Sequence, residues 1–153
     1  MISRRKTREY LLQLLYARAT QHDTFERDIF NVEFFDEEDF TTTDAAYLKN
    51  LEDGVISHER ELLDITAALA PKFELETMPV IHIIIIMIAL AEMLGYAGEV
   101  IPESVSANEA VELAKRFSDS QGKNFINGTL ATFLKDRPKI LLAKKEGTYK
   151  IFE

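Results

Sequence analysis

The chain has 153 residues, 46% of them hydrophobic, which indicates a single domain with a substantial core. The chain has no cysteine, which excludes disulfides, thiolate metal sites and a cysteine nucleophile, and a cytoplasmic protein is expected. The net charge of −8 argues against nucleic acid, but residues 1–10 and 135–150 are basic, whereas residues 22–53 carry eleven acids against two bases.

The first predicted element is a helix that runs from about Ser3 to Gln21. Ser3 is placed to cap its N-terminus, and apolar residues recur at helical spacing beyond it. The first turns hold four cations where the helix dipole is already positive, which disfavours them. A bound anion would account for the cluster, and an irregular N-terminus would account for it equally well. The four are Arg4, Arg5, Lys6 and Arg8.

Two further helical segments are predicted before the middle of the chain. Residues 24–40 are expected to form a short helix that ends in an acidic, solvated loop, without the glycine-containing spacing of a calcium loop. A longer helix, capped by Thr43 or Asp44, is expected to run to about Ala70. A bend is expected near Gly54, which interrupts the apolar stripe of that helix.

The most apolar stretch of the chain, residues 80–91, is interrupted only by His82. Its four consecutive isoleucines favour a strand, whereas its continuation into alanine, leucine and methionine favours a helix. We predict a helix from about Thr77 to Gly95, with Thr77 as its N-cap, buried on most sides; a buried strand is the alternative. The strictly apolar part is too short to cross a membrane, which needs about 18 residues or more.

Two more helices complete the predicted order. The first spans about Ser104–Phe117, with Val105 among its inward residues. After a short turn, Ser120 is placed to cap a last helix, which Pro138 is expected to end.

Residues 139–153 are basic and are expected to form a loose or loosely docked tail after a domain over residues 1–138. The three histidines do not have the spacing of a metal pair, and no phosphate-binding or nucleophile motif is present in the sequence. We therefore expect no active site, no metal and no cofactor.

Five short segments form a pattern that is more specific than any one of them. They are RRKTRE at residues 4–9, QLLY at 13–16, IALAEM at 88–93, SANEAVELAKRF at 106–117 and KNFINGTL at 123–130. In this order they resemble RRxARExALQxLY, LALYEL, xINEAVELAKxF and xKFVNGVL of the NusB family of bacterial transcription antitermination factors. The resemblance runs from about residue 3 to residue 134 and does not cover the tail.

The resemblance implies an all-α, NusB-like fold of two small helical bundles around the central apolar helix, and a protein that is not an enzyme. It also implies binding of the single-stranded boxA element of RNA together with NusE, a small-subunit ribosomal protein. The RNA polymerase elongation complex would then read through terminators, mainly in ribosomal RNA operons. A homodimer is left open.

The RNA-binding residues follow from the resemblance and from the chemistry of single strands, whose phosphates are held by cations and whose bases stack on aromatic rings. The family places RNA contacts at Phe117 and Phe125 and in the turn between them. Tyr16, eight residues after Arg8, is close to the same helix face. Core packing is the alternative for both phenylalanines. The expected set is Arg4, Arg5, Lys6, Arg8, Tyr16, Phe117, Lys123, Asn124 and Phe125.

Several positions depart from the family's pattern and remove charge or add apolar surface. Ser104 and Asn124 stand where the family has lysine, Met87 where it has arginine, and Ala91 where it has tyrosine. Gln121 and Gly122 stand in place of an acidic residue and serine, and His82 and Ile83 replace charged residues. These changes motivate an alternative function, a helical protein-interaction module with weak or lost RNA binding.

Overall fold

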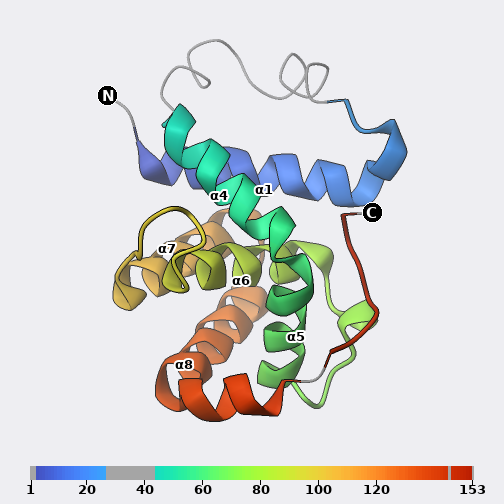
Figure 1. Cartoon of the computed structure of the whole chain (residues 1–153), viewed down its shortest axis with the longest axis vertical. Helices are drawn as coiled ribbons and strands as arrows, with labels where there is room; N and C mark the ends of the chain where they lie inside the picture. Colours follow the sequence, from blue (N-terminus) through green and yellow to red (C-terminus); the bar gives the residue numbers. More distant parts are fainter. Residues whose placement is uncertain (1–2, 27–43, 145, 153) are drawn as a thin grey trace.

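A computed structural model describes residues 3–26, 44–144 and 146–152, and the regular elements in these ranges are all helices (Figure 1). The expected all-α fold is therefore confirmed. The helix predicted over residues 24–40 lies mostly outside the described residues. The described α-helices are α1 (Arg4–Gln21), α4 (Ala45–Ser57), α5 (Glu59–Leu69), α6 (Val80–Met93), α7 (Glu103–Phe117) and α8 (Ser120–Ala143), with short 3₁₀ helices η1 (His22–Thr24) and η2 (Leu75–Thr77).

Helix α6 lies at the centre of the fold and packs against α1, α4, α5, α7 and α8. In Figure 1, α1 and α4 cross above it, and α5 and α8 lie below it. Every residue from Ile83 to Met93 is buried, because neighbouring helices surround this segment. The apolar run is thus the shared core helix of both bundles, as predicted, and not a strand.

The start of α6 differs from the prediction, since Thr77 is not its N-cap. Thr77 lies in η2, and its hydroxyl donates to the carbonyl of Glu74 at 2.7 Å. Met78 is extended, as expected of a residue before proline, so the helix cannot begin before Pro79. Pro79 itself flanks the first turn of α6.

The bend predicted in the long helix that runs to about Ala70 is a complete break. His58 separates α4 from α5, and Asp44 caps α4 by accepting the N–H of Tyr47 at 3.0 Å. A Cβ atom at Gly54 would lie 2.2 Å from the carbonyl oxygen of Tyr96. The missing side chain therefore lets the loop after α6 lie against α4, where the Tyr96 and His58 rings stack with centroids 3.6 Å apart.

The two ends of α8 correct two further expectations. Asp119, not Ser120, is the N-cap, because its carboxylate accepts the N–H of Gly122 at 2.7 Å. Pro138 does not end the helix. The chain kinks at Asp136 (φ −120°, ψ 31°) and then resumes a helical path to Ala143. Proline is tolerated there because it falls in the first turn after the kink, where its missing N–H would have no helical acceptor.

Helix α7 begins one residue earlier than expected, and its buried face is rotated from the predicted one. Val105 is 43% exposed, contrary to expectation, whereas Ser106 is buried. Ala110, Leu113 and Ala114 form the buried stripe that packs toward α6 and α8.

The C-terminal segment is docked, so of the expected loose or loosely docked tail the loose alternative is wrong. Ile151 and Phe152 are buried, and the Glu59 carboxylate accepts the backbone N–H of both, at 2.7 and 3.2 Å. Arg60 donates to the carbonyl of Tyr149 at 2.7 Å. The polar first turn of α5 thus holds the backbone of the tail, while its two apolar side chains enter the core.

Candidate nucleic-acid interface

The four cations of the first turns of α1 do not share one environment. Ser3 caps the helix as predicted, by accepting the N–H of Lys6 at 3.2 Å. Arg4, Arg5 and Lys6 are exposed, whereas Arg8 is 4% exposed. The sequence-predicted cluster is therefore three surface cations and one core cation.

Two of the surface cations are paired with acids that lie 95 and 104 residues later in the chain. Arg5 donates two hydrogen bonds to the Glu109 carboxylate, at 3.0 and 2.9 Å, a geometry that only arginine provides. This bond to Arg5 holds the pKa of Glu109 below its usual range, although partial burial opposes the shift. Arg4 pairs with Glu99 in the loop before α7. A phosphate at this end of α1 would have to compete with both carboxylates.

Arg8 belongs to a buried polar cluster. Its Nε donates to Glu92 on α6 at 2.8 Å, and the Tyr47 hydroxyl of α4 donates to the same carboxylate. Burial, followed by the adjacent Glu92 charge, raises the pKa of Tyr47 far above its usual value. Because Glu92 is 1% exposed, its charge needs these partners. Arg8 therefore joins α1 to the central helix and is not available at the surface.

A continuous stripe of exposed and half-exposed residues runs along α1 from the surface cation Arg5. Arg5, Glu9 and Gln13 recur every four residues, and Tyr16 and Thr20 continue the same face. Tyr16 is 42% exposed. It thus follows Arg5 on the accessible face and not Arg8, whose side chain is turned into the core.

Tyr16 and Phe117, predicted from opposite ends of the sequence, line one hollow. It has a volume of about 460 Å³ and lies where α1, the start of α6 and the end of α7 meet. Gln13 and Ile81 contribute to its wall, and Phe117 is half-buried in it. The Arg116 guanidinium lies 5.5 Å from the centre of the Phe117 ring, so a cation adjoins this aromatic surface.

A second hollow, of about 330 Å³, contains Phe125 and lies between the starts of α6 and α8. His82 and Gly122 also line it, and the His82 Nε2 lies 2.7 Å from the Ser118 hydroxyl. A Cβ at Gly122 would lie 2.5 Å from His82 Nε2. Glycine therefore allows α8 to begin this close to α6. Burial lowers the pKa of His82, and the nearby Asp119 carboxylate opposes the shift.

The two hollows flank the first turn of α6, because Ile81 lines the first and His82 the second. The structure thus groups Tyr16, Phe117 and Phe125 around that turn. Lys123 and Asn124 follow Gly122 in the first turns of α8, half-buried and exposed respectively. Ile81, His82 and Phe73 also line these hollows, although the sequence alone did not indicate them. Only Phe73 carried a recognisable signal, because it is an aromatic residue in a polar loop that contains a proline.

The departures from the family's pattern fall into two physical groups. Met87 and Ala91 are fully buried, so they alter the core and not an accessible surface. Ser104, Gln121 and Asn124 are exposed and do change what a bound molecule would meet.

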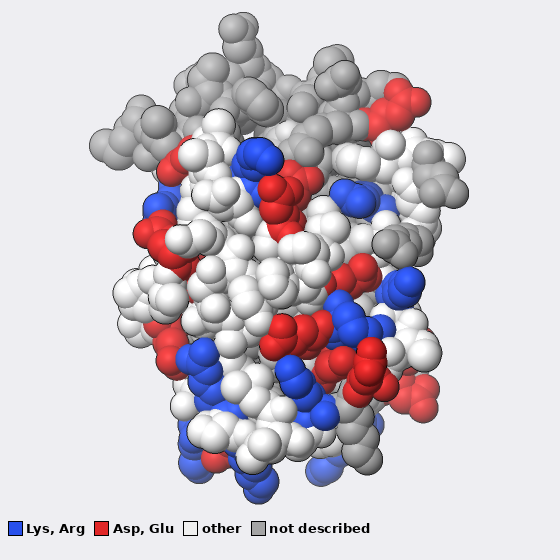
Figure 2. All heavy atoms as spheres, viewed as in Figure 1, with Lys and Arg blue, Asp and Glu red and all other residues white. Residues whose placement is uncertain are grey.

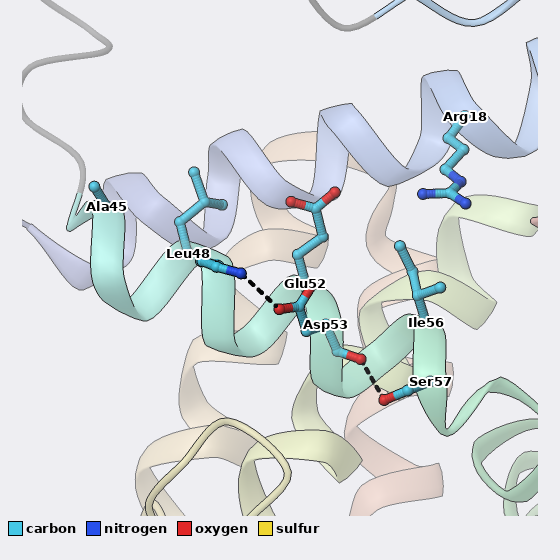
Figure 3. Close-up of a pocket in the computed structure, with 8 residues that line it drawn as sticks. Arg18, Ala45, Leu48, Glu52, Asp53, Ile56 and Ser57 are labelled. Atoms are coloured by element: carbon cyan, nitrogen blue, oxygen red, sulfur yellow. Dashed lines mark hydrogen bonds and ion pairs between the residues drawn. The ribbon is translucent and has the colours of Figure 1, made fainter.

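Another hollow, of about 680 Å³, lies elsewhere, between α1 and α4. Figure 3 shows the Glu52 side chain reaching from α4 toward α1 and Arg18 pointing from α1 toward α4. Acids and bases are mixed in its lining, and it contains none of the predicted site residues. We therefore do not assign it to nucleic acid.

Charge is also mixed on the face that carries α4 and α5. Figure 2 shows acidic and basic side chains interspersed across its middle, with basic ones gathered at the lower end, where Figure 1 places α8. Among the described residues, no group of three or more histidines or acids is placed to hold a metal ion. No helix in the described ranges is long and apolar enough to cross a bilayer.

The sequence is similar to proteins of one known family along most of its length. The sequence pattern of the NusB family matches residues 5–135. The transcription antitermination protein NusB of Lacticaseibacillus casei is 36% identical over 143 residues, which cover 91% of this chain and 99% of that protein. The proteins of the same name from Ligilactobacillus salivarius and Clostridium perfringens are each 34% identical, over 87% and 84% of this chain and 98% and 94% of their own lengths.

Proposed function

The chain belongs to the NusB family of transcription antitermination factors, and from that premise we propose that it binds single-stranded boxA RNA together with NusE. The assembly would act on the RNA polymerase elongation complex and promote read-through of terminators, mainly in ribosomal RNA operons. Its place of action would be the cytoplasm. The role is one of binding and assembly, without a catalysed reaction.

The observation that carries this proposal is the surface around the first turn of α6. Tyr16 and Phe117 are 101 positions apart in the sequence but line one hollow, and Phe125 lies in the next. The exposed stripe of α1 connects this aromatic surface with Arg5. A single strand needs cations along its phosphates and rings for its unstacked bases, and this surface offers both.

The ion pairs of the surface cations predict weak binding by the chain alone. Phosphates would have to displace Glu109 from Arg5 and Glu99 from Arg4, and the net charge of −8 repels RNA at long range. A basic partner that contacts the same strand would add phosphate contacts. NusE would then strengthen RNA binding, and RNA would strengthen NusE binding by the same factor.

The test is a titration of labelled boxA RNA at about 0.1 M salt, near the ionic strength where surface charges are partly screened. It is done with and without saturating NusE, beside a scrambled RNA of the same length. We expect preference for boxA and a marked gain with NusE. Equal affinity in the two arms would contradict the cooperative assembly.

The same ion pairs favour a second candidate function, a protein-interaction module that has kept the fold and lost useful RNA binding. Acids from the loop before α7 and from α7 itself already satisfy Arg4 and Arg5. This candidate predicts NusE binding without any discrimination between boxA and the scrambled RNA. The titration above therefore separates the two functions.

A further inference from the structure

The lysines of α8 differ from the surface arginines of α1 because no acid lies beside them. Lys123, Lys135 and Lys139 form no ion pair with any residue in the described ranges, whereas Arg4 and Arg5 are each paired with a carboxylate. Lys135 and Lys139 are exposed, and Figure 2 shows basic side chains gathered where Figure 1 places the second half of α8. A phosphate could therefore bind these two lysines without displacing an acid.

The carboxylates that neighbouring helices bring to this end of α8 are already paired with other cations. Glu103 of α7 lies 3.1 Å from Arg137, and Glu61 of α5 lies 3.2 Å from Lys144. Asp136, the acid between the two lysines in the sequence, is half-buried beside the kink and pairs with neither of them. The second half of α8 thus keeps an excess of positive charge in a chain whose net charge is −8.

One exposed side of α8 connects these lysines with the surface around Phe125. Its exposed positions recur every three or four residues, the spacing of neighbours on one side of a helix. In its middle, a Cβ atom at Gly128 would meet nothing within 4 Å, so no contact inside the described chain requires glycine there. Glycine weakens a helix by about 1 kcal/mol relative to alanine, and the close approach of another backbone would account for it. These positions, which we call the α8 face, are Asn124, Asn127, Gly128, Ala131, Leu134, Lys135, Pro138 and Lys139.

The α8 face begins where the proposed function already places RNA. A strand held at Phe125 continues beyond boxA, and its next nucleotides are kept at a high effective concentration near α8. Lys139 follows Lys123 by about 24 Å along the path of the helix, and Lys135 and Lys139 are one turn apart. Lysine binds a phosphate as a point charge and reads no base, so such contacts would not depend on sequence.

We propose that the α8 face binds the single-stranded RNA that flanks boxA, with Lys135 and Lys139 as phosphate contacts. This second binding surface rests on the proposed function and lies beyond the two hollows that carry it. An acidic protein is the other occupant that these lysines would suit, together with Leu142, which lies beyond Lys139 and is 88% exposed. RNA is favoured because the face is continuous with the proposed RNA-binding surface and its middle is small and polar.

The first experiment compares boxA RNA with boxA extended at its 5′ or its 3′ end by about eight nucleotides, within the range of single-strand sites, at saturating NusE. Two added phosphate contacts should make the slope of log K against log salt steeper by about 1.4. One of the extended RNAs should then lose about 7-fold more affinity than boxA alone between about 50 and 200 mM salt.

The matched variants locate these added contacts. Changing Lys135 and Lys139 together to Gln should remove the additional salt dependence and leave the binding of boxA alone unchanged. Lys49→Gln combined with Lys150→Gln removes the same charge from exposed positions on α4 and in the tail, and should keep it. Melting temperatures should be unchanged in both double variants, since all four side chains are exposed.

The second experiment tests a protein as the occupant. Without RNA, the K135Q/K139Q variant should bind NusE as the natural chain does. Leu142→Ser should leave the affinity for the extended RNA unchanged. A loss of NusE binding by K135Q/K139Q in the absence of RNA would overturn the proposal, because the face would then be a protein contact.

The third experiment uses the absence of cysteine from the chain. Ala131→Cys, in the middle of the α8 face, carries a tethered iron chelate that cleaves nearby RNA, and Ala46→Cys at an exposed position on α4 is the control. With extended RNA and NusE, the chelate on A131C should cut the nucleotides next to boxA, whereas that on A46C should cut none. Cuts confined to boxA, or no cuts from A131C, would overturn the proposal.

The failure of this proposal can be distinguished from the failure of the proposed function. If K135Q/K139Q keeps the additional salt dependence of the extended RNA, the α8 face is wrong, and a preference for boxA over scrambled RNA still supports the proposed function. If the natural chain with NusE does not prefer boxA, the proposed function is wrong. Cleavage from residue 131 that is lost in K135Q/K139Q would then still identify α8 as an RNA-binding surface.

Discussion

Arg5 and Arg8 lie one turn apart on α1, but only Arg5 could contact RNA without disturbing the core. Arg5 is exposed in its pair with Glu109, whereas Arg8 is 4% exposed and satisfies Glu92. Residues of the same type that lie close together in a sequence can thus have different physical roles, and their burial in the structure distinguishes them.

Replacing Arg8 should therefore destabilise the fold. Arg8→Met leaves the buried Glu92 charge without its arginine, and such a loss costs about 3–5 kcal/mol of unfolding free energy. Urea unfolding would measure it, with Arg5→Met as the matched control. A loss for R8M no larger than for R5M would mean that Glu92 is satisfied without Arg8.

Replacing the exposed cations should instead change the salt dependence of RNA binding. Each phosphate contact to a single strand contributes about −0.7 to the slope of log K against log salt, so the double change of Arg4 and Arg5 to Ala should flatten it by about 1.4. Lys49→Ala, which removes an exposed cation paired with Asp53 on α4, is the control and should leave the slope unchanged. The same slope in all three proteins would remove Arg4 and Arg5 from the interface.

At the scale of elements, α6 and α8 show how strongly packing outweighs local preference. Four consecutive isoleucines favour a strand, but helices on all sides bury them as a helix. In α8, Pro138 would end an isolated helix, but here it follows a kink after which the helix continues. Phe133 and Ile140, on either side of the kink, are both buried, so packing holds both parts of α8 against the core.

The core role of α6 can be measured with single truncations. Ile85 and Ile86 are fully buried, so Ile85→Ala or Ile86→Ala should cost about 2–5 kcal/mol of unfolding free energy. Val100→Ala, at a position that is 70% exposed, should stay within about 0.5 kcal/mol. A small loss of unfolding free energy for both isoleucine variants would mean that these side chains are exposed to solvent.

The start of α8 offers a test between two adjacent residues. Asp119→Ala removes the acceptor for the Gly122 N–H and should cost about 0.5–2 kcal/mol, whereas Ser120→Ala should cost almost nothing. Thermal unfolding of the two variants would decide. A larger loss for S120A would mean that the serine caps the helix after all.

At the scale of the whole molecule, the C-terminal segment ties the last residues to α5. Phe152 is 4% exposed, and Glu59 holds the backbone of residues 151 and 152. The tail thereby adds to the core, and none of its described residues lines either of the two hollows of the proposed RNA-binding surface.

Phe152→Ala should therefore lower stability and leave RNA binding unchanged. The loss of unfolding free energy is expected to be at most about 3–5 kcal/mol. It cannot exceed the free energy with which the tail docks, because the tail can undock while the helices stay folded. Lys150→Ala, at an exposed position in the same segment, is the control. A changed boxA affinity for F152A at a temperature where it is fully folded would connect the tail with the interface.

The sequence by itself determined the helical class, the central place of the apolar run, the cap at Ser3 and the family, and it narrowed the cap of α4 to Thr43 or Asp44. These depend on patterns within one segment, such as apolar periodicity and capping side chains, or on matched motifs. The tertiary structure decided what depends on residues far apart in the chain. It buried Arg8 against Glu92, paired Arg5 with Glu109, docked Phe152 on the core and brought Phe73 to Phe125. Such contacts form only when helices pack, so no single segment contains the information that specifies them.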